Sequence, residues 1–237
     1  MSLFGSQAPV NYSERQALQL WNAVAYNDCR QFAFFDGTHW QHPKHCFDTF
    51  NNFYEFVVKN KVKDVHVKAL FDGGGREWVV DVDFKEKDKA LLDLKILVAQ
   101  RTFINFFGDS VARVMHSGNR GIHVWLKIDR FRMSADKLFR ARYYKAFVKP
   151  KVIDVKKITP GSFIYNLKSV IDCADIKAEI QHYVNSNNNN DNDFAVTQQI
   201  LQDFWPDVDQ HVFCNLNQIR APFSFNSKGN KFSVQLH

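Results

Sequence analysis

The segment Trp78–Phe84, with the sequence Trp-Val-Val-Asp-Val-Asp-Phe, constrains the fold more than any other part of the chain. Its β-branched and aromatic residues are typical of a β-strand. Side chains alternate between the two faces of a strand, so Asp81 and Asp83 share one face, roughly 7 Å apart. Two carboxylates on an apolar strand repel each other, and burying either one is costly. The segment therefore predicts a divalent-cation site, because Mg²⁺ favours carboxylate, phosphate and water oxygens.

The Asp-x-Asp pattern is not unique to one kind of site. Many copies are solvated residues in loops or at strand ends, and short motifs arise often by chance. Glycosyltransferases use an Asp-x-Asp to hold a metal-bound nucleoside diphosphate. The rest of the chain has to separate these alternatives.

The bulk composition is that of an ordinary globular protein, and 237 residues suit one large domain covering residues 1–237. No apolar run is long enough for a membrane span, and no secretory signal is visible. The four cysteines are scattered without a Cys-x-x-Cys pair, which predicts free thiols in a reducing, intracellular compartment. The Asn-rich segment 185–193 predicts a flexible surface loop.

Helical and strand patterns follow one another along the chain. Apolar periodicity predicts helices over 14–24, 48–59 and 88–107, and alternation predicts strands over 62–71, 110–116 and 122–127. Residues 30–40 predict a strand, an Asp-Gly turn and a second strand rich in aromatic residues. Histidines and a cysteine gather between His39 and Cys46, but their spacing matches no common zinc module, so surface histidines are the favoured interpretation.

Positive charge is concentrated in one stretch. The whole chain has a net charge of +6, whereas residues 127–157 alone hold eleven Lys or Arg and three Asp, a net charge of +8. This concentration favours a polyanionic partner, above all nucleic acid, over a helix face that is merely solvated.

Two stripes follow from helical spacing within this basic stretch. Phe139, Tyr143 and Phe147 fall at i, i+4 and i+8, which predicts a stripe that faces the core. The other stripe is basic and free to meet DNA phosphates; it consists of Arg142, Lys145 and Lys149.

Residues 117–125, with the sequence Ser-Gly-Asn-Arg-Gly-Ile-His-Val-Trp, form a second motif. A glycine-flanked turn exposes backbone N–H groups that can line an anion, and Arg120 offers a planar fork for phosphate. Ser117 supplies a hydroxyl, and His123 begins a strand at the same end of the sheet. These groups suit a triphosphate beside metal ions. Taken alone, the motif would favour a hairpin turn with a chance arginine and a structural histidine.

The two motifs in this order resemble the small catalytic subunit of archaeo-eukaryotic DNA primases. That family has a strand with two aspartates at alternating positions, followed further along by a Ser-Gly-x-Arg-Gly-hydrophobic-His turn. Residues 30–34, Arg-Gln-Phe-Ala-Phe, also resemble an Arg-Glu-Phe-x-Phe segment of the family.

The third family motif is a metal-binding aspartate that precedes a basic residue and a Pro-containing segment. Asp209 fits this pattern best, with Asp207 as the alternative, and residues 219–229 match the segment that follows. Asn119 and Asn226 depart from the family pattern, which often has a second arginine and a histidine there.

The resemblance implies an α+β fold, in which a mixed β-sheet carries the active site and helices pack behind it. Residues 85–100 contain no cysteine or histidine, so the zinc knob of many cellular primases is not expected. The compact size and the Asp-x-Asp strand are most similar to the baculovirus members of the family. The implied function is a viral DNA primase that makes short RNA primers on single-stranded DNA from nucleoside triphosphates. The implied partner is a large or accessory subunit (late expression factor two), and the implied location is the host nucleus.

The resemblance also assigns roles to individual residues. Two Mg²⁺ or Mn²⁺ ions would be held by Asp81, Asp83 and Asp209, with Asp207 as the alternative. The expected nucleotide-binding residues are Ser117, Gly118, Asn119, Arg120, His123, Arg220, Asn226 and Lys228.

Three rival functions stay open. A repair-type primase-polymerase would share all three motifs but would prefer existing ends. A non-catalytic DNA-binding replication factor would need only the basic surface. A glycosyltransferase would explain Asp81 and Asp83 but not the turn at residues 117–123 or the basic stretch.

Overall fold

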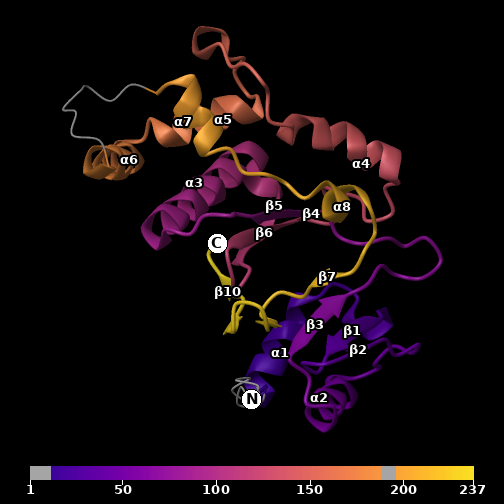
Figure 1. The fold of residues 1–237 in the computed structure, drawn as a ribbon. Helices are drawn as coiled ribbons and strands as arrows, with labels where there is room; N and C mark the ends of the chain where they lie inside the picture. Colours follow the sequence, from indigo (N-terminus) through magenta and orange to yellow (C-terminus); the bar gives the residue numbers. More distant parts are fainter. Residues whose placement is uncertain (1–11, 188–195) are drawn as a thin grey trace.

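The computed structural model describes residues 12–187 and 196–237 (Figure 1). Its α-helices are α1 (Glu14–Ala23), α2 (Phe50–Lys59), α3 (Lys89–Phe107), α4 (Lys137–Tyr144), α5 (Phe163–Ile171), α6 (Ala174–Asn187), α7 (Gln198–Asp203) and α8 (Gln210–Cys214). Short 3₁₀ helices are η1 (Asn27–Cys29), η2 (Gly108–Ser110), η3 (Lys145–Phe147) and η4 (Val155–Lys157). The strands are β1 (Phe32–Phe35), β2 (Trp40–Gln41), β3 (Asp64–Val67), β4 (Val79–Asp83), β5 (Val111–His116), β6 (Gly121–Leu126), β7 (Ile219–Arg220), β8 (Phe225–Asn226), β9 (Lys231–Phe232) and β10 (Val234–Gln235).

The described strands form two four-stranded sheets and one two-stranded sheet. The larger sheets have the orders β2-β1-β3-β7 and β10-β5-β6-β4, and β8 pairs with β9. Helices and sheets are both present, which confirms the α+β fold. Every pairing between the described strands is antiparallel, whereas a mixed sheet was expected. The strand order explains the difference. β6 lies between β5 and β4 and pairs antiparallel with both, so β4 and β5 are not paired with each other.

One face of the β10-β5-β6-β4 sheet packs against helices. Val80 and Val82 of β4 are fully buried in a core that also contains Val98 of α3 and Phe163 of α5. Figure 1 shows α3, α5 and α7 stacked on this side of the sheet. The alternation in the Asp-x-Asp strand therefore has the predicted consequence, since Val80 and Val82 face the helices and the two aspartates face away.

A second core lies between the β2-β1-β3-β7 sheet and helices α1 and α2. Phe32 and Phe34 of β1 pack with Trp21 of α1 and Phe53 of α2. Ser13 begins α1 with a capping box, which satisfies backbone groups at the helix start. Val79, Met115 and Trp125 also belong to this core, so it reaches the aspartate-bearing face of the other sheet.

A buried ion pair links the two sheets. Arg30 is fully buried and precedes β1, and its guanidinium donates to Glu77 just before β4 at 2.6 Å. It also donates to the carbonyl oxygens of Lys68 and Ala25. The arginine of the Arg-Gln-Phe-Ala-Phe segment is thus a structural connection between the sheets.

The stripe of aromatic residues on α4 differs from the prediction. Phe147 is buried, but Phe139 and Tyr143 are 44% and 46% exposed. Their rings contact Trp78 edge to face, at centroid distances of 6.1 and 5.2 Å. The core-facing position belongs instead to Arg140, whose guanidinium lies over Trp78 and donates to three backbone carbonyls. The prediction of a core-facing stripe was therefore wrong for Phe139 and Tyr143.

Three further expectations concern the Asn-rich segment, membrane spans and the cysteines. Helix α6 continues to Asn187, so residues 185–187 are helical, and the remainder of the expected Asn-rich loop lies outside the described residues. Among the described helices, none is both long and apolar enough to cross a membrane. The four cysteines carry free thiols.

Candidate active site

A pocket of about 330 Å³ joins residues from both large sheets and from the segments that follow α7. β4 contributes Asp81 and Asp83, and β6 contributes His123, which lies opposite Asp81 in the antiparallel register. The further polar side chains that line the pocket are His66, Ser117, Asn119, Asp209, Gln218, Arg220, Asn226 and Lys228. The structure therefore brings together most of the site residues that were predicted from separate motifs.

Backbone contacts place Asp209 beside the Asp-x-Asp strand. Its N–H donates to the carbonyl oxygen of Asp81 at 2.8 Å, and Val208 forms a bridge with Val82. Asp209 lines the pocket, whereas Asp207 does not. The geometry thus favours Asp209 over Asp207 as the third carboxylate.

Burial makes the charge on Asp81 unfavourable. Its pKa is raised above the ordinary value, mainly by burial and further by the nearby carboxylates of Asp209 and Asp83. His123 opposes this effect, with Nε2 at 3.4 Å from Oδ1 of Asp81. Crowded carboxylates around a partly buried one fit the chemistry of a hard divalent cation, whose charge would relieve both the burial and the repulsion.

The carboxylates are engaged with protein groups in this structure. Asp209 is the N-cap of α8, and its Oδ1 accepts a hydrogen bond from the N–H of Val212. Oδ2 of Asp83 accepts a hydrogen bond from the guanidinium of Arg120 at 3.1 Å. Within residues 12–187 and 196–237, no three His, Cys, Asp or Glu side chains stand close enough to hold an ion as they are. Holding a cation would therefore require these side chains to turn toward Asp81.

His123 is a buried imidazole that faces the pocket. Burial lowers its pKa below the ordinary value, Asp81 opposes this shift, and the charges of Arg220 and Arg76 add to it. The neutral ring is therefore favoured near neutral pH, with one nitrogen able to donate and the other to accept.

Glycines allow the 117–121 turn to approach the Asp-x-Asp strand closely and the 226–229 turn to approach the 117–121 turn. A Cβ at Gly121 would lie 1.8 Å from the carbonyl oxygen of Val82, and one at Gly229 would lie 1.9 Å from that of Gly118. Gly118 has a φ of +80°, which glycine adopts without strain. The 117–121 turn therefore lies directly between β4 and the 226–229 turn.

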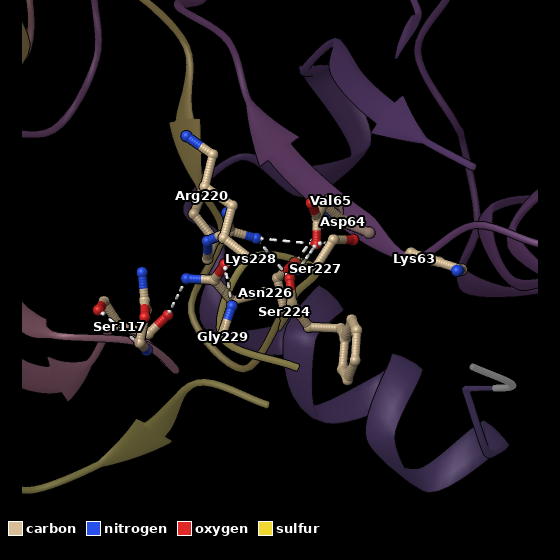
Figure 2. Close-up of polar contacts among 12 residues, drawn as sticks. Lys63, Asp64, Val65, Ser117, Arg220, Ser224, Asn226, Ser227, Lys228 and Gly229 are labelled. Atoms are coloured by element: carbon tan, nitrogen blue, oxygen red, sulfur yellow. Dashed lines mark hydrogen bonds and ion pairs between the residues drawn. The ribbon is translucent and has the colours of Figure 1, made fainter. Parts of the chain in front are cut away.

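Asn226 connects these two turns (Figure 2). Its Nδ2 donates to the carbonyl oxygen of Ser117 at 2.8 Å, and its Oδ1 accepts from the N–H groups of Lys228 and Gly229. Both ends of its amide are thus used by the backbone, although the residue lines the predicted nucleotide pocket.

Asp64 holds Arg220 in place and was missed by the sequence analysis. Its Oδ1 accepts from Arg220 at 3.1 Å and from the N–H and hydroxyl of Ser227 at 2.8 and 3.1 Å (Figure 2). Arg220 also donates to the carbonyl oxygen of Phe225. Alternation in the sequence would have put Asp64 and His66 on one face of β3, but their partners lie far along the chain and give no local signal.

His66 is the second residue that the sequence analysis missed. It lies opposite Arg220 in the register of β3 and β7 and lines the pocket. Burial, together with the charges of Arg220 and His123, holds the pKa of His66 well below its usual value.

Gly118, Arg120 and the predicted DNA-binding residues lie outside the pocket lining. Arg120 is half exposed and pairs with Asp83. The basic residues of the α4 stripe are all exposed on α4, on η3 or just after it; they are Arg142, Lys145 and Lys149. This basic surface adjoins the site through Tyr144, whose hydroxyl donates to the carbonyl oxygen of Val208 at 3.3 Å.

Comparison with known proteins places these features in a family. The chain is 44% identical over 228 residues to a DNA primase of Autographa californica nuclear polyhedrosis virus, covering 94% of this chain and 80% of that protein. It is 41% identical over 233 residues to late expression factor 1 of Orgyia pseudotsugata multicapsid polyhedrosis virus, covering 95% and 88%. A scan against models of protein families gives no match.

The pocket of this α+β protein thus combines three carboxylates with a glycine-flanked turn. At this identity and coverage, the chain belongs to the baculovirus DNA primase family that includes late expression factor 1.

Proposed function

We propose that this chain is the catalytic subunit of a viral DNA primase, which makes short RNA primers on a single-stranded DNA template. The observation that carries the proposal is that Asp81, Asp83 and Asp209 meet beside the 117–121 turn at one pocket. The supporting comparison is the relative named DNA primase, which is similar over nearly the whole chain.

Asp81, Asp83 and Asp209 would hold two Mg²⁺ or Mn²⁺ ions. Such ions lower the pKa of an attacking 3′-hydroxyl and stabilise the charge that develops on the pyrophosphate. The raised pKa of the Asp81 carboxyl supports this role, because burial and, to a lesser extent, the carboxylates of Asp209 and Asp83 disfavour its charge, which a cation would stabilise.

The other pocket residues would bind the incoming nucleoside triphosphate. Neutral His123 can donate a hydrogen bond to a phosphate oxygen from a buried position. Arg220 is held rigidly by Asp64, so its guanidinium would be preorganised toward phosphate. Ser117, Asn119 and Lys228 line the same pocket and would complete the contacts.

Arg120 would have two states in this scheme. It pairs with Asp83 in the structure. When Asp83 turns toward a cation, Arg120 would be free to meet the triphosphate, together with the backbone N–H groups of the turn at Gly118.

The template, the partner and the location are also part of the proposal. Arg142, Lys145 and Lys149 would contact DNA phosphates on the surface that adjoins the site. An accessory primase subunit, late expression factor two, would complete the enzyme, and the host nucleus would be its place of work.

A primer-synthesis assay tests the function. The full chain is incubated with single-stranded DNA, ribonucleotides and Mg²⁺ or Mn²⁺, with and without the accessory subunit. We expect new RNA oligomers from the wild type and none from the Asp81→Ala/Asp83→Ala double variant. Equal activity of the two proteins would contradict the assignment.

The same assay, repeated with a supplied primer or with a nucleoside diphosphate sugar, separates the rival functions. A repair-type polymerase would extend a supplied primer but would not start a strand. A non-catalytic factor would bind DNA without making product, and a glycosyltransferase would consume a nucleoside diphosphate sugar instead of ribonucleotides.

A further inference from the structure

Four aromatic rings form a ledge on the open face of the β2-β1-β3-β7 sheet, and the function described above does not use it. The ledge consists of Phe35, Trp40, His42 and His66. Trp40 is central, with ring centroids at 5.3 Å from Phe35, 4.6 Å from His66 and 6.4 Å from His42. Trp40 is 39% exposed, although a tryptophan gains most from burial.

Strand register makes the ledge continuous with the candidate active site. Trp40 lies opposite Phe35, and His66 lies opposite both Ala33 and Arg220 in the neighbouring strands. His66 lines the site pocket, whereas Phe35, Trp40 and His42 do not. The ledge therefore begins at the pocket wall and leads away from it.

The chemistry of the ledge suits the flat face of a nucleobase. Aromatic side chains stack on bases with little dependence on sequence, since every base has a π-face. His66 adds a neutral ring, because burial and the charges of Arg220 and His123 disfavour its protonation.

The ledge extends across the sheet from the pocket wall, where the ring of His66 lies 4.6 Å from that of Trp40. Trp40 on β2 is three strands from Arg220 on β7, which corresponds to about 14 Å at the usual strand spacing. Nucleic acid that runs out of the pocket past His66 would therefore meet the ledge.

We propose that this ledge binds an unpaired base of the single-stranded template by stacking on Trp40. The inference rests on the proposed function, since it takes the pocket to be the point where template and nucleotide meet. It adds a base-binding surface on the β2-β1-β3-β7 sheet, separate from the basic residues Arg142, Lys145 and Lys149.

Matched variants and two probes test the ledge. The variants are Trp40→Ala, Trp40→Phe and, as a control with similar exposure on a distant helix, Tyr165→Ala, at a residue that is 41% exposed. The probes are a fluorescein-labelled oligo-dT and an oligomer of equal length made of abasic sites, which keeps the phosphates and lacks the bases. Affinity is measured by fluorescence anisotropy with the full chain at fixed salt.

We expect Trp40→Ala to weaken oligo-dT binding by at least about fivefold, because one base–aromatic stack is lost. Its affinity for the abasic oligomer should match that of the wild type. Trp40→Phe should retain most of the oligo-dT affinity, and Tyr165→Ala should behave as the wild type with both probes.

Two results would overturn the inference. Equal oligo-dT affinity of Trp40→Ala and the wild type would show that no base stacks there. Weaker binding of free ribonucleotides by Trp40→Ala, with unchanged oligo-dT binding, would assign the ledge to the incoming nucleotide instead.

The test separates this inference from the proposed function. The Asp81→Ala/Asp83→Ala variant should keep the oligo-dT affinity of the wild type while it loses primer synthesis. If the wild type made no primers and Trp40→Ala still lost oligo-dT affinity, the proposed function would fail and the ledge would stand.

Discussion

Single side chains at the candidate site owe their protonation to burial. Asp81 and His123 are neighbours whose pKa values shift in opposite directions for this one reason, since burial disfavours the anion of one and the cation of the other. The pair therefore presents a carboxylate that gains from a cation and an imidazole that stays neutral. His66 is also a buried imidazole with a lowered pKa, so it stays neutral as well.

The low pKa of His66 makes a prediction about stability. The folded protein binds fewer protons at His66 than the unfolded chain does, so the stability is complete above the ordinary value of about 6.5 and is lost as the pH falls through it. We expect the wild-type free energy of unfolding to fall between pH 7.5 and pH 5.5. His66→Phe should reduce this slope by up to about 1.4 kcal/mol per pH unit.

Urea unfolding followed by circular dichroism at several pH values measures this slope. Part of it should remain in the variant, because His123 is buried with a lowered pKa as well. An identical slope for His66→Phe and the wild type would contradict the burial argument.

At the scale of elements, a buried ion pair joins the residues that precede β1 and β4, which belong to different large sheets. Arg30 and Glu77 are both almost fully buried, and removing one partner leaves the other charged and unpaired. We expect Arg30→Met to lower the free energy of unfolding by about 3–5 kcal/mol. The double variant Arg30→Met/Glu77→Leu should lose less than the sum of the two single variants, as measured in a double-mutant cycle. Simple additivity would show that the two side chains do not stabilise each other.

Helix α4 makes an independent prediction about salt. Arg142, Lys145 and Lys149 are exposed, and each phosphate contact to single-stranded nucleic acid contributes about 0.7 to the slope of log affinity against log salt. Replacing all three by Gln should therefore reduce the magnitude of that slope by about 2. Replacing Lys85, Lys87 and Lys89, which lie before and at the start of α3, is the matched control. An unchanged slope for the α4 variant would exclude this helix from the DNA-binding surface.

Local signals predicted several elements, and tertiary context decided the rest. The alternation in β4 gave both the strand and its two faces, because a strand in a sheet has only two environments. The stripe on α4 failed because Arg140, with three carbonyl partners and Trp78, occupies the position that aromatic residues were expected to fill. Helical spacing cannot show such partners.

At the scale of the whole molecule, the candidate site exists only when distant segments meet. Asp81, His123 and Asp209 were identified from their motifs because each motif carries its own local pattern. Asp64 and His66 were not, since their roles come from Arg220 on a strand that pairs with β3 across most of the chain. The open faces of the two sheets, and not any single motif, define the pocket and the ledge beside it.

In the proposed function, Asp81, Asp83 and Asp209 act at one reaction centre. The most direct measurement compares primer synthesis by Asp209→Asn and Asp207→Asn under identical conditions, with folding verified by circular dichroism. We expect Asp209→Asn to lose about a hundredfold to a thousandfold in rate, as for the loss of one transition-state contact, and Asp207→Asn to retain wild-type activity. Equal activities of the two variants, or a greater loss in Asp207→Asn, would contradict the account.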